Sequence, residues 1–133
     1  MEQFTVRSSK REIVMDITSD VKKIVENSSI SSGICIVYIP HTTAGVTINE
    51  NADPSVKVDI KETLEKLIPA GDHYRHLEGN ADSHLKASIM GSSATIIIEN
   101  GQLQLGTWQG IQFCEFDGPR NRTVWVTLLD RNC

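Results

Sequence analysis

Residues 33–50 of the chain read GICIVYIPHTTAGVTINE. The part from Gly33 to Pro40 is apolar and rich in β-branched side chains, which predicts a strand buried on both faces. The part from Val46 to Glu50 alternates in polarity, which is typical of a strand with one exposed face. His41, Thr42, Thr43 and Ala44 lie between the two parts. The stretch therefore predicts two strands joined by a polar connection, and such connections commonly carry functional side chains.

A helix is expected on each side of this stretch. Downstream, Asp53 before Pro54 predicts a helix start, because the carboxylate accepts from free backbone amides and proline lacks the amide that would stay unpaired. The core face of this helix is predicted at Val56, Ile60, Leu64, Leu67 and Ile68. Upstream, Ser19 and Asp20 offer capping oxygens for a short amphipathic helix. Its apolar positions are Val21, Ile24 and Val25.

A third helix is expected within residues 72–91, DHYRHLEGNADSHLKASIMG, which hold three of the four histidines. Asp82 or Ser83 would cap this helix. Its apolar face is predicted at Leu85, Ile89 and Met90. His84 then stands in the first turn, where the helix dipole favours the neutral imidazole that a general base or a metal ligand needs. The alternative is a solvated loop followed by an ordinary capped helix.

The remaining segments are predicted to be strands. The N-terminal segments Gln3 to Arg7 and Glu12 to Ile17 predict a hairpin, because a short polar turn joins them. Asn100-Gly101 predicts a tight hairpin between segments 95–99 and 102–105, and a further hairpin is expected between segments 110–116 and 122–129. We therefore expect residues 1–133 to form a single α+β domain, with a largely antiparallel sheet or sandwich and three short to medium helices.

The composition excludes several classes of protein. The formal net charge is −4 and the isoelectric point is near 5.5, whereas a protein that neutralises nucleic-acid phosphates needs a basic surface. Cys35, Cys114 and Cys133 are too few and too widely spaced to predict a disulfide framework, which favours the reducing cytoplasm. No apolar run approaches the roughly 20 residues of a membrane span. We expect a cytoplasmic protein without nucleic-acid or membrane partners.

Polar side chains at the predicted strand and loop ends suggest one site. The candidates are His41, Glu50, Asn51, His76 and His84. The three imidazoles would bind zinc together with a water molecule, whereas magnesium would prefer carboxylates. The carboxylates available are Glu50, Asp53, Glu78 and Asp82. The spacing does not choose between the two metals, and each histidine has the alternative of a structural role.

A second group of candidates lies closer to the C-terminus. Trp108 offers a flat apolar face for a ring, and Gln109 offers an amide for hydrogen bonds. Arg120 and Arg122 offer planar forks that match phosphate oxygens. Together these groups predict a site for a phosphorylated ring compound. Alternatively, Trp108 packs in the core and the arginines are ordinary turn charges.

Several short motifs occur together and in order over most of residues 33–130. They are PHTTAGVTINENADPSVKVDI, Tyr74-Arg75-His76, EGNADSHLKASIMG, LGTWQGI, and Glu115 with DGPRNR. In this combination the chain resembles the YjbQ-like family, also called the secondary thiamine-phosphate synthase family. The resemblance implies a compact α+β protein that assembles into homotrimers. It also implies an enzyme that joins the pyrimidine and thiazole halves of thiamine phosphate, which in part of the family is a side activity.

The resemblance further implies a common polar pocket. Its lining would comprise His41, Glu50, Asn51, His76 and His84, with Trp108, Gln109 and Glu115 nearby and Arg120 or Arg122 at the phosphate. Some members have an acidic residue directly after the position of His76 and a proline just before the Ser-His pair. This chain has Leu77 and Asp82 there, which bears on the identity of any metal.

We therefore expect a transferase of the thiamine-phosphate synthase type, with His41, Glu50, His76 and His84 as catalytic residues. A divalent metal ion and an arginine would stabilise the departing pyrophosphate. The alternatives are a metal-dependent hydrolase of a small phosphorylated or acyl substrate, and a non-catalytic trimeric module that binds a phosphate-bearing metabolite. A homotrimer is also expected because the apolar segments 33–39, 95–99 and 124–129 exceed the area that three helices can cover.

Overall fold

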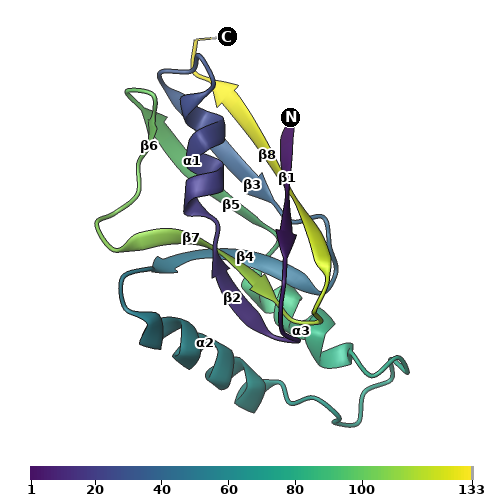
Figure 1. Cartoon of the computed structure of the whole chain (residues 1–133). Helices are drawn as coiled ribbons and strands as arrows, with labels where there is room; N and C mark the ends of the chain where they lie inside the picture. The colour runs from purple at the N-terminus through teal and green to yellow at the C-terminus, as the bar shows by residue number, and fades with distance from the viewer. Residues whose placement is uncertain (133) are drawn as a thin grey trace.

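The computed structural model describes residues 1–132 of the chain. Within this range the chain forms eight strands and three helices (Figure 1). In chain order they are β1 (Glu2–Arg7), β2 (Ile13–Asp16), α1 (Thr18–Glu26), β3 (Gly33–Tyr38), β4 (Ala44–Glu50), α2 (Pro54–Leu67), α3 (Ala81–Met90), β5 (Ser93–Glu99), β6 (Gln102–Leu103), β7 (Gln109–Glu115) and β8 (Asn121–Asp130).

Two antiparallel sheets form the body of a single compact α+β domain, as the sequence predicts. One sheet has five strands in the order β1, β8, β3, β5 and β6, and the other has three strands in the order β2, β7 and β4. Every neighbouring pair is antiparallel. The connection from β3 to β4 takes the chain from the larger sheet to the smaller, and this connection contains His41.

Two of the three predicted hairpins are wrong. β1 pairs with β8, and β2 pairs with β7, so the two N-terminal strands lie in different sheets. β7 and β8 also follow each other in the chain and belong to different sheets. The hairpin across Asn100-Gly101 is confirmed, with Ile98 opposite Leu103. Alternating polarity identifies a strand but not its partner, and the partners here come from distant parts of the chain.

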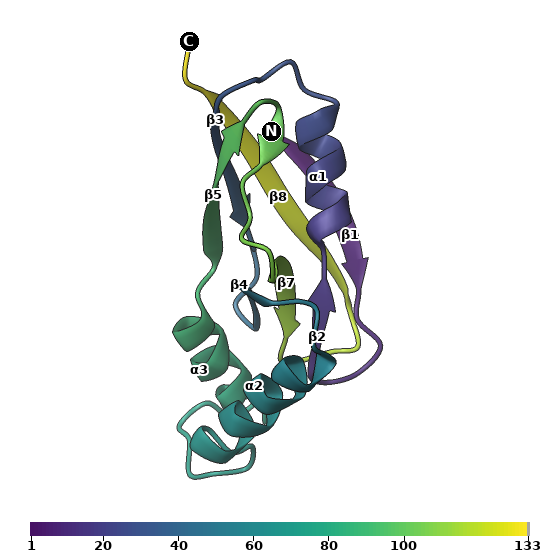
Figure 2. The ribbon, with the colours of Figure 1, turned by 90° about the vertical axis from the view of Figure 1, so that its left-hand side faces the viewer.

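The main core lies between the two sheets and α1. Its fully buried side chains include Val21 and Val25 of α1, Val37 of β3, Ile98 of β5 and Phe113 of β7. Figure 2 shows α1 on one side of the larger sheet. Each fully buried side chain of this size contributes about 1.5–3 kcal/mol, so this cluster is the main source of stability.

α2 and α3 cover the other face of the smaller sheet (Figure 2). A second apolar cluster lies there, formed by Leu64, Ala87, Cys114 and Phe116. The predicted start of α2 is confirmed, because the Asp53 carboxylate accepts from the backbone amide of Ser55 at 2.9 Å. The prediction of Leu67 as a core residue is wrong, since this side chain is 71% exposed. Leu67 lies 100° around the helix from the buried Ile68 and therefore off the narrow face that meets the sheet.

α3 exposes most of its apolar side. Of the three positions predicted to form its core face, only Met90 packs against a core cluster. Leu85 is 45% exposed and Ile89 is 67% exposed. The helix itself is confirmed, but the assignment of its buried face is wrong.

The buried side of α3 is polar instead. Asp82, Ser83 and Lys86 are all at most 1% exposed. Neither Asp82 nor Ser83 caps the helix as predicted, because Asp82 binds Arg11 and the Ser83 hydroxyl donates to the Phe116 carbonyl oxygen at 2.6 Å. Charged and polar partners from other elements thus decide which side of α3 is buried.

Cys35 lies in β3 and Cys114 lies in β7. Cys35 and Cys114 are free and buried, and burial raises the pKa of their thiols to about 11 and about 12, respectively. Both thiols therefore stay protonated near neutral pH. Cys133 lies outside the described residues. Among residues 1–132, no helix combines the length and the apolar character needed to cross a bilayer.

Candidate functional site

His41 lies in the connection between β3 and β4, at one end of the smaller sheet. Its Nε2 accepts a hydrogen bond from the backbone amide of Thr123 at 2.9 Å, so the proton of the neutral ring is on Nδ1. Burial lowers the pKa of His41, and the nearby Arg122 guanidinium lowers it further. Nδ1 has no acceptor among residues 1–132. His41 is therefore a neutral imidazole with one N–H group available to a ligand.

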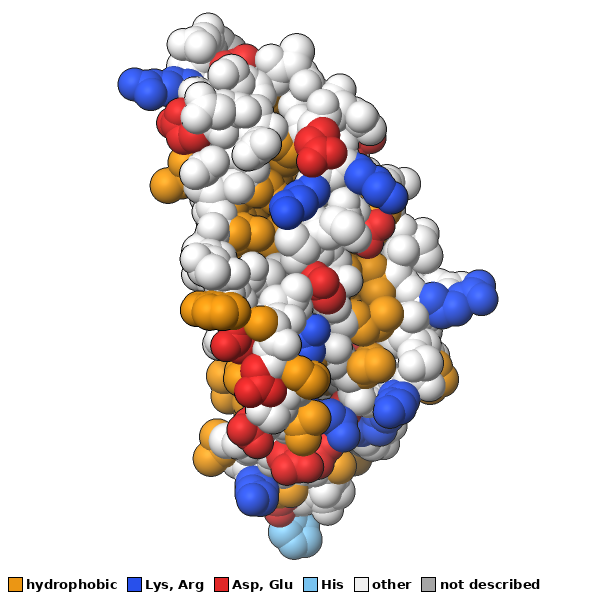
Figure 3. Space-filling model, turned by 60° about the vertical axis from the view of Figure 1, so that its left-hand side comes forward, with side chains coloured by type: hydrophobic (Ala, Val, Ile, Leu, Met, Phe, Trp, Pro, Cys, Tyr) orange, Lys and Arg blue, Asp and Glu red, His pale blue; other side chains and the backbone are white. Residues whose placement is uncertain are grey.

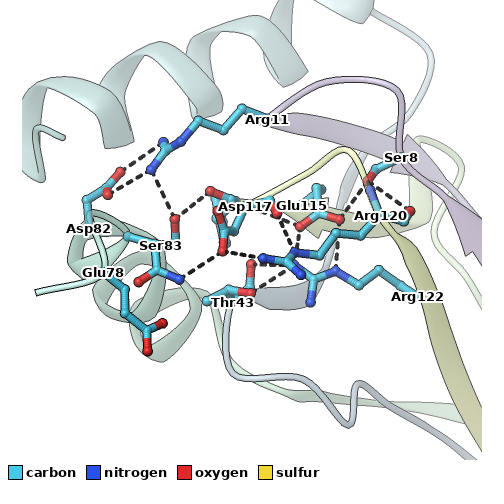
Figure 4. A network of polar contacts seen from close by, with 12 residues as sticks. Ser8, Arg11, Thr43, Glu78, Asp82, Ser83, Glu115, Asp117, Arg120 and Arg122 are labelled. Carbon is cyan, nitrogen blue, oxygen red and sulfur yellow. Dashed lines mark hydrogen bonds and ion pairs between the residues drawn. The ribbon is translucent and has the colours of Figure 1, made fainter. Parts of the chain in front are cut away.

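A buried ion pair fixes this end of the sheet (Figure 4). Arg122 donates to Glu115 Oε1 at 2.9 Å and to Thr43 Oγ1 at 2.8 Å, and Ser8 donates to the same carboxylate at 2.7 Å. Burial acts to raise the pKa of Glu115, but the bonds from Arg122 and Ser8 outweigh it and lower the pKa. Both residues of the pair were predicted to bind substrate. Their charged groups instead bind each other and anchor the backbone beside His41.

His41 and His84 line the same cavity, which has a volume of ≈ 400 Å³. The other lining residues are Thr42, Ala44, Ala87, Ser88, Gly91 and Ser92. The cavity lies between α3 and the connection before β4, where the helix approaches the strand closely. This approach requires Gly45, because a Cβ atom there would lie 2.7 Å from the Gly91 carbonyl oxygen.

His84 also lines a second cavity, of ≈ 330 Å³, together with His76. The two imidazole rings make an edge-to-face contact, with centroids 5.0 Å apart and planes at 75°. His76 Nε2 lies 3.7 Å from Glu78 Oε2, and the side chain of His76 is 42% exposed. The structure thus brings His76 and His84 together, and His84 connects them to the cavity of His41.

Glu50 and Asn51 lie at the opposite end of β4 from His41. The strand has seven residues, which is about 20 Å at 3.3 Å per residue, so these side chains do not share a pocket with His41 in one chain. Asn51 Nδ2 donates to Asp16 Oδ2 at 2.9 Å, and the Asn51 amide donates to the Trp108 carbonyl oxygen at 2.8 Å. The predicted polar pocket is therefore divided into a histidine end and an Asn51 end.

The aromatic and amide candidates lie at the Asn51 end. Trp108 is 64% exposed and so is not part of the core, which leaves its ring face available. Gln109 Oε1 accepts from the backbone amide of Gly106 at 2.8 Å, so this amide stabilises the turn before β7. The structure therefore retains Trp108 as a ring-binding candidate and assigns Gln109 a local structural contact.

Three buried acceptor oxygens at or near this end lack hydrogen-bond partners among the described residues. They are Glu50 Oε2, Asn51 Oδ1 and Gln112 Oε1. Gln112 is fully buried, and its Nε2 donates to the Glu50 carbonyl oxygen at 2.7 Å. The sequence analysis did not select Gln112, although a glutamine inside the apolar run of residues 110–116 is a signal that could have identified it.

Arg120 is partly available for a ligand. It is 54% exposed, and its guanidinium binds Asp117, with Nε at 2.7 Å from the carbonyl oxygen and a terminal nitrogen at 3.1 Å from the carboxylate. An exposed pair of this kind contributes only about 0–1 kcal/mol, so an anion can compete for Arg120 more easily than for the buried Arg122.

The three histidines do not fit a zinc site within one chain. His41 Nε2 is occupied by the Thr123 amide, and a metal at Nδ1 would require the proton to move to the nitrogen that faces this amide. The carboxylates suggested for magnesium are also dispersed, since Asp53 caps α2 and Asp82 binds Arg11. No group of three or more His, Cys, Asp or Glu side chains within residues 1–132 has the arrangement of a metal site.

The sequence analysis also missed a buried charge network on the polar side of α3. Lys86 binds Glu12 and Asp82, and Arg11 binds both oxygens of Asp82. The spacing of Asp82 and Lys86, four residues apart on a helix, indicates a possible pair. No local pattern identifies Glu12, because it is 74 residues from Lys86 in the chain.

Comparison with known proteins agrees with this fold over nearly its whole length. A family described as "UPF0047 protein YjbQ-like" matches residues 2–131. A UPF0047 protein of Methanocaldococcus jannaschii is 51% identical over 127 residues, which cover 96% of this chain and 92% of the relative. The UPF0047 protein YugU of Bacillus subtilis is 46% identical over 130 residues, which cover 97% of this chain and 98% of the relative.

Solved structures show the same fold. The crystal structure of a YjbQ/UPF0047 protein from Clostridium acetobutylicum has a TM-score of 0.95 and 53% identity, covering 97% of this chain and 100% of that one. A protein from Aeropyrum pernix has a TM-score of 0.93 and 40% identity, with 98% of each chain covered. The family match and the identities lead to one conclusion: the chain belongs to the YjbQ-like UPF0047 family.

Proposed function

We propose that the protein is a transferase of the thiamine-phosphate synthase type, acting on small phosphorylated metabolites in the cytoplasm. The observation that carries this proposal is His41, whose Nε2 is occupied and whose Nδ1 proton remains available beside a cavity shared with His84. Such a donor suits an oxygen that gains negative charge during the reaction. Membership of the YjbQ-like family supports the choice of reaction.

In the proposed reaction, the ring nitrogen of the thiazole phosphate attacks the methylene carbon of the hydroxymethyl-pyrimidine diphosphate. A carbon–nitrogen bond forms, the carbon–oxygen bond to the diphosphate breaks, and the electron pair leaves with pyrophosphate. His41 donates a hydrogen bond to the departing oxygen, and His84 stands in the same cavity. One well-placed imidazole of this kind accelerates a reaction by about 10²- to 10⁴-fold.

We also propose that the working protein is a homotrimer. Because Glu50 and Asn51 are about 20 Å from His41 in one chain, a pocket that contains both groups needs two neighbouring chains. A threefold ring joins two different surfaces of each chain, so every chain must offer two patches.

Two separate apolar patches are available on the chain. The outer face of the larger sheet exposes Ile34, Tyr38, Ile97 and Leu129, and α3 exposes Leu85 and Ile89. The inner face of that sheet is already covered by α1 and the main core. Figure 3 shows one face of the molecule, where hydrophobic side chains at the surface are interspersed with charged ones. We propose that the sheet patch of one chain meets the α3 patch of the next.

The activity is tested by incubating the purified protein with both thiamine precursors and measuring thiamine phosphate and pyrophosphate. Equal amounts of the two products are expected. His41→Ala should slow the reaction about 100-fold or more. His73→Ala is the matched control, because His73 is exposed on the loop before α3 and should leave the rate unchanged.

Two other results would replace this proposal. Hydrolysis of a single phosphorylated or acyl substrate that depends on added metal would identify a metal-dependent hydrolase. Binding of the phosphorylated compounds without turnover would identify a trimeric binding module.

A further inference from the structure

A charged groove lies on the side of α3 opposite His84. It has a volume of ≈ 450 Å³ and lies between α2, α3 and the segment that joins β1 to β2. Its lining residues are Lys10, Arg11, Glu12, Lys61, Glu65, Pro69, Ala70 and Lys86. Successive helical residues are about 100° apart, so His84 and Lys86 point about 160° apart around α3. The groove is therefore separate from the two histidine cavities.

The floor of the groove is a fixed network of charges. Lys86 contacts Glu12 and donates to Asp82 Oδ2 at 3.1 Å. Arg11 binds the two oxygens of Asp82 at 3.1 and 3.0 Å and reaches Ser83 Oγ at 3.3 Å (Figure 4). Burial acts to raise the pKa of Asp82, but the bonds from Arg11 and Lys86 outweigh it and lower the pKa. Asp82 is thus an anion that holds two cations in place at the groove.

The carboxylates around the groove are paired with cations, while some ammonium protons of its lysines have no carboxylate acceptor. Glu12 binds Lys86, and Glu65 lies 3.4 Å from Lys61. Lys10 has no carboxylate partner among residues 1–132. Lys86 has a third ammonium proton beyond those directed at Glu12 and Asp82. The groove therefore needs acceptor oxygens, which a phosphate or diphosphate group supplies.

The charge of the groove depends on whether the Glu12 carboxyl group is protonated. Burial raises the pKa of Glu12, and a hydrogen bond shared with Glu65 raises it further, whereas the same bond lowers the pKa of Glu65. Protonation of Glu12 removes a negative charge from the wall. The charged groups around this glutamate lie on three segments of the chain. They are Arg11 of the segment that joins β1 to β2, Lys61 and Glu65 of α2, and Asp82 and Lys86 of α3.

The arginines predicted from the sequence to bind phosphate are less suitable. Arg122 is buried against Glu115, and the half-exposed Arg120 makes two contacts with Asp117. In contrast, Lys10 stands at the edge of a cavity without a competing carboxylate.

We propose that this groove binds a tetrahedral oxyanion, namely the phosphate or diphosphate group of a small metabolite. Lys10 and Lys61 contact the anion from the rim, and Lys86 and Arg11 face it from the floor. The site does not depend on the proposed transferase activity, because it lies on the other side of α3 from the histidines.

Isothermal titration calorimetry with inorganic phosphate, pyrophosphate and sulfate tests the proposal. A variant with both Lys10→Ala and Lys61→Ala should bind each anion at least about tenfold more weakly, because each change removes a charged donor. A control variant with both Lys23→Ala and Lys66→Ala loses the same two charges outside the groove and should keep the wild-type affinity. All four lysines are away from the core, so both variants should fold.

Sulfate provides a second measurement, because it stays a dianion while a carboxyl group takes up its proton. Its affinity should rise as the pH falls through the raised pKa of Glu12, and Glu12→Gln should remove this rise. Equal affinities of the Lys10/Lys61 variant and the wild type would overturn the proposal, as would a wild type that binds none of the three anions. Turnover of the thiamine precursors is measured separately, so failure of the transferase proposal leaves this test intact.

Discussion

His41 shows how one side chain can take its protonation state from distant parts of the chain. Its pKa is below the ordinary value of 6.5, because burial and Arg122 both disfavour the charged ring. In the unfolded chain His41 takes up a proton near pH 6.5, and in the folded chain it does so only at lower pH. The stability from the neutral ring is therefore present above pH 6.5 and is lost as the pH falls through the lowered pKa.

We predict that the free energy of unfolding of the wild type decreases between pH 7 and pH 5, and that His41→Asn reduces this decrease. Urea unfolding at a series of pH values measures both. His73→Asn is the control, because His73 is exposed and the change should keep the wild-type slope. An identical pH slope in wild type and His41→Asn would contradict the neutral buried imidazole.

The buried ion pair of Arg122 and Glu115 leads to a second prediction. Glu115→Gln leaves the guanidinium of Arg122 buried without a counter-charge, so it should destabilise the protein by about 3–5 kcal/mol. The corresponding change beside the half-exposed Arg120, Asp117→Asn, should cost about 0–1 kcal/mol, because the new amide oxygen can still accept from Asn80. Urea unfolding at pH 7 compares the two variants.

The pH dependence gives an independent check on the Glu115 prediction. The pKa of Glu115 is lower than its ordinary value of 4.5, so the stabilisation by its carboxylate is complete above pH 4.5 and is lost as the pH falls through the lowered pKa. The difference between wild type and Glu115→Gln should therefore shrink below pH 4.5. A constant difference down to pH 2 would argue against an ionised pair.

The packing of α3 on β4 determines whether His84 and His41 share a cavity. Gly45 permits this packing, because a Cβ atom there would lie 2.7 Å from the Gly91 carbonyl oxygen and 3.2 Å from Met90 Cβ. We predict that Gly45→Ala moves the end of α3 and destabilises the protein by about 1–3 kcal/mol. Gly106→Ala is the control, since its new Cβ would meet only the flexible Gln109 side chain, and it should change stability by about 0.5 kcal/mol or less. Equal unfolding midpoints would contradict the close approach.

At the scale of the whole molecule, the uncovered apolar surface predicts assembly. Ile97 is 60% exposed on the larger sheet and Ile89 is 67% exposed on α3. If these two patches meet in a threefold ring, then Ile97→Glu and Ile89→Glu should each break the same interface, because each places a charge in an apolar contact. Size-exclusion chromatography with light scattering should show three 14.7 kDa chains for the wild type and smaller species for both variants.

Val58→Glu is the matched control for assembly, because Val58 is 49% exposed on α2, outside both patches. This variant should remain a trimer. A wild type that is monomeric at micromolar concentration would exclude both the trimer and a pocket shared between chains.

Local patterns in the sequence determined much of this fold. Alternation and apolar runs located the strands, the Asp53-Pro54 pair marked the start of α2, and Asn100-Gly101 identified the one correct hairpin. These features were predictable because they depend on neighbours two to four residues away. The family motifs also singled out His41, His76 and His84, which the structure links through two cavities that share His84.

Only the tertiary structure decided which strands pair, which side of α3 is buried and which charges remain available. Lys86 is 1% exposed because Glu12, 74 residues earlier in the chain, meets it across two elements. Arg122 is occupied because Glu115 folds back from the preceding strand of the other sheet. The physical reason is that burying a charge is favourable only when a partner arrives with it, and a sequence pattern does not contain the position of a partner from a distant segment.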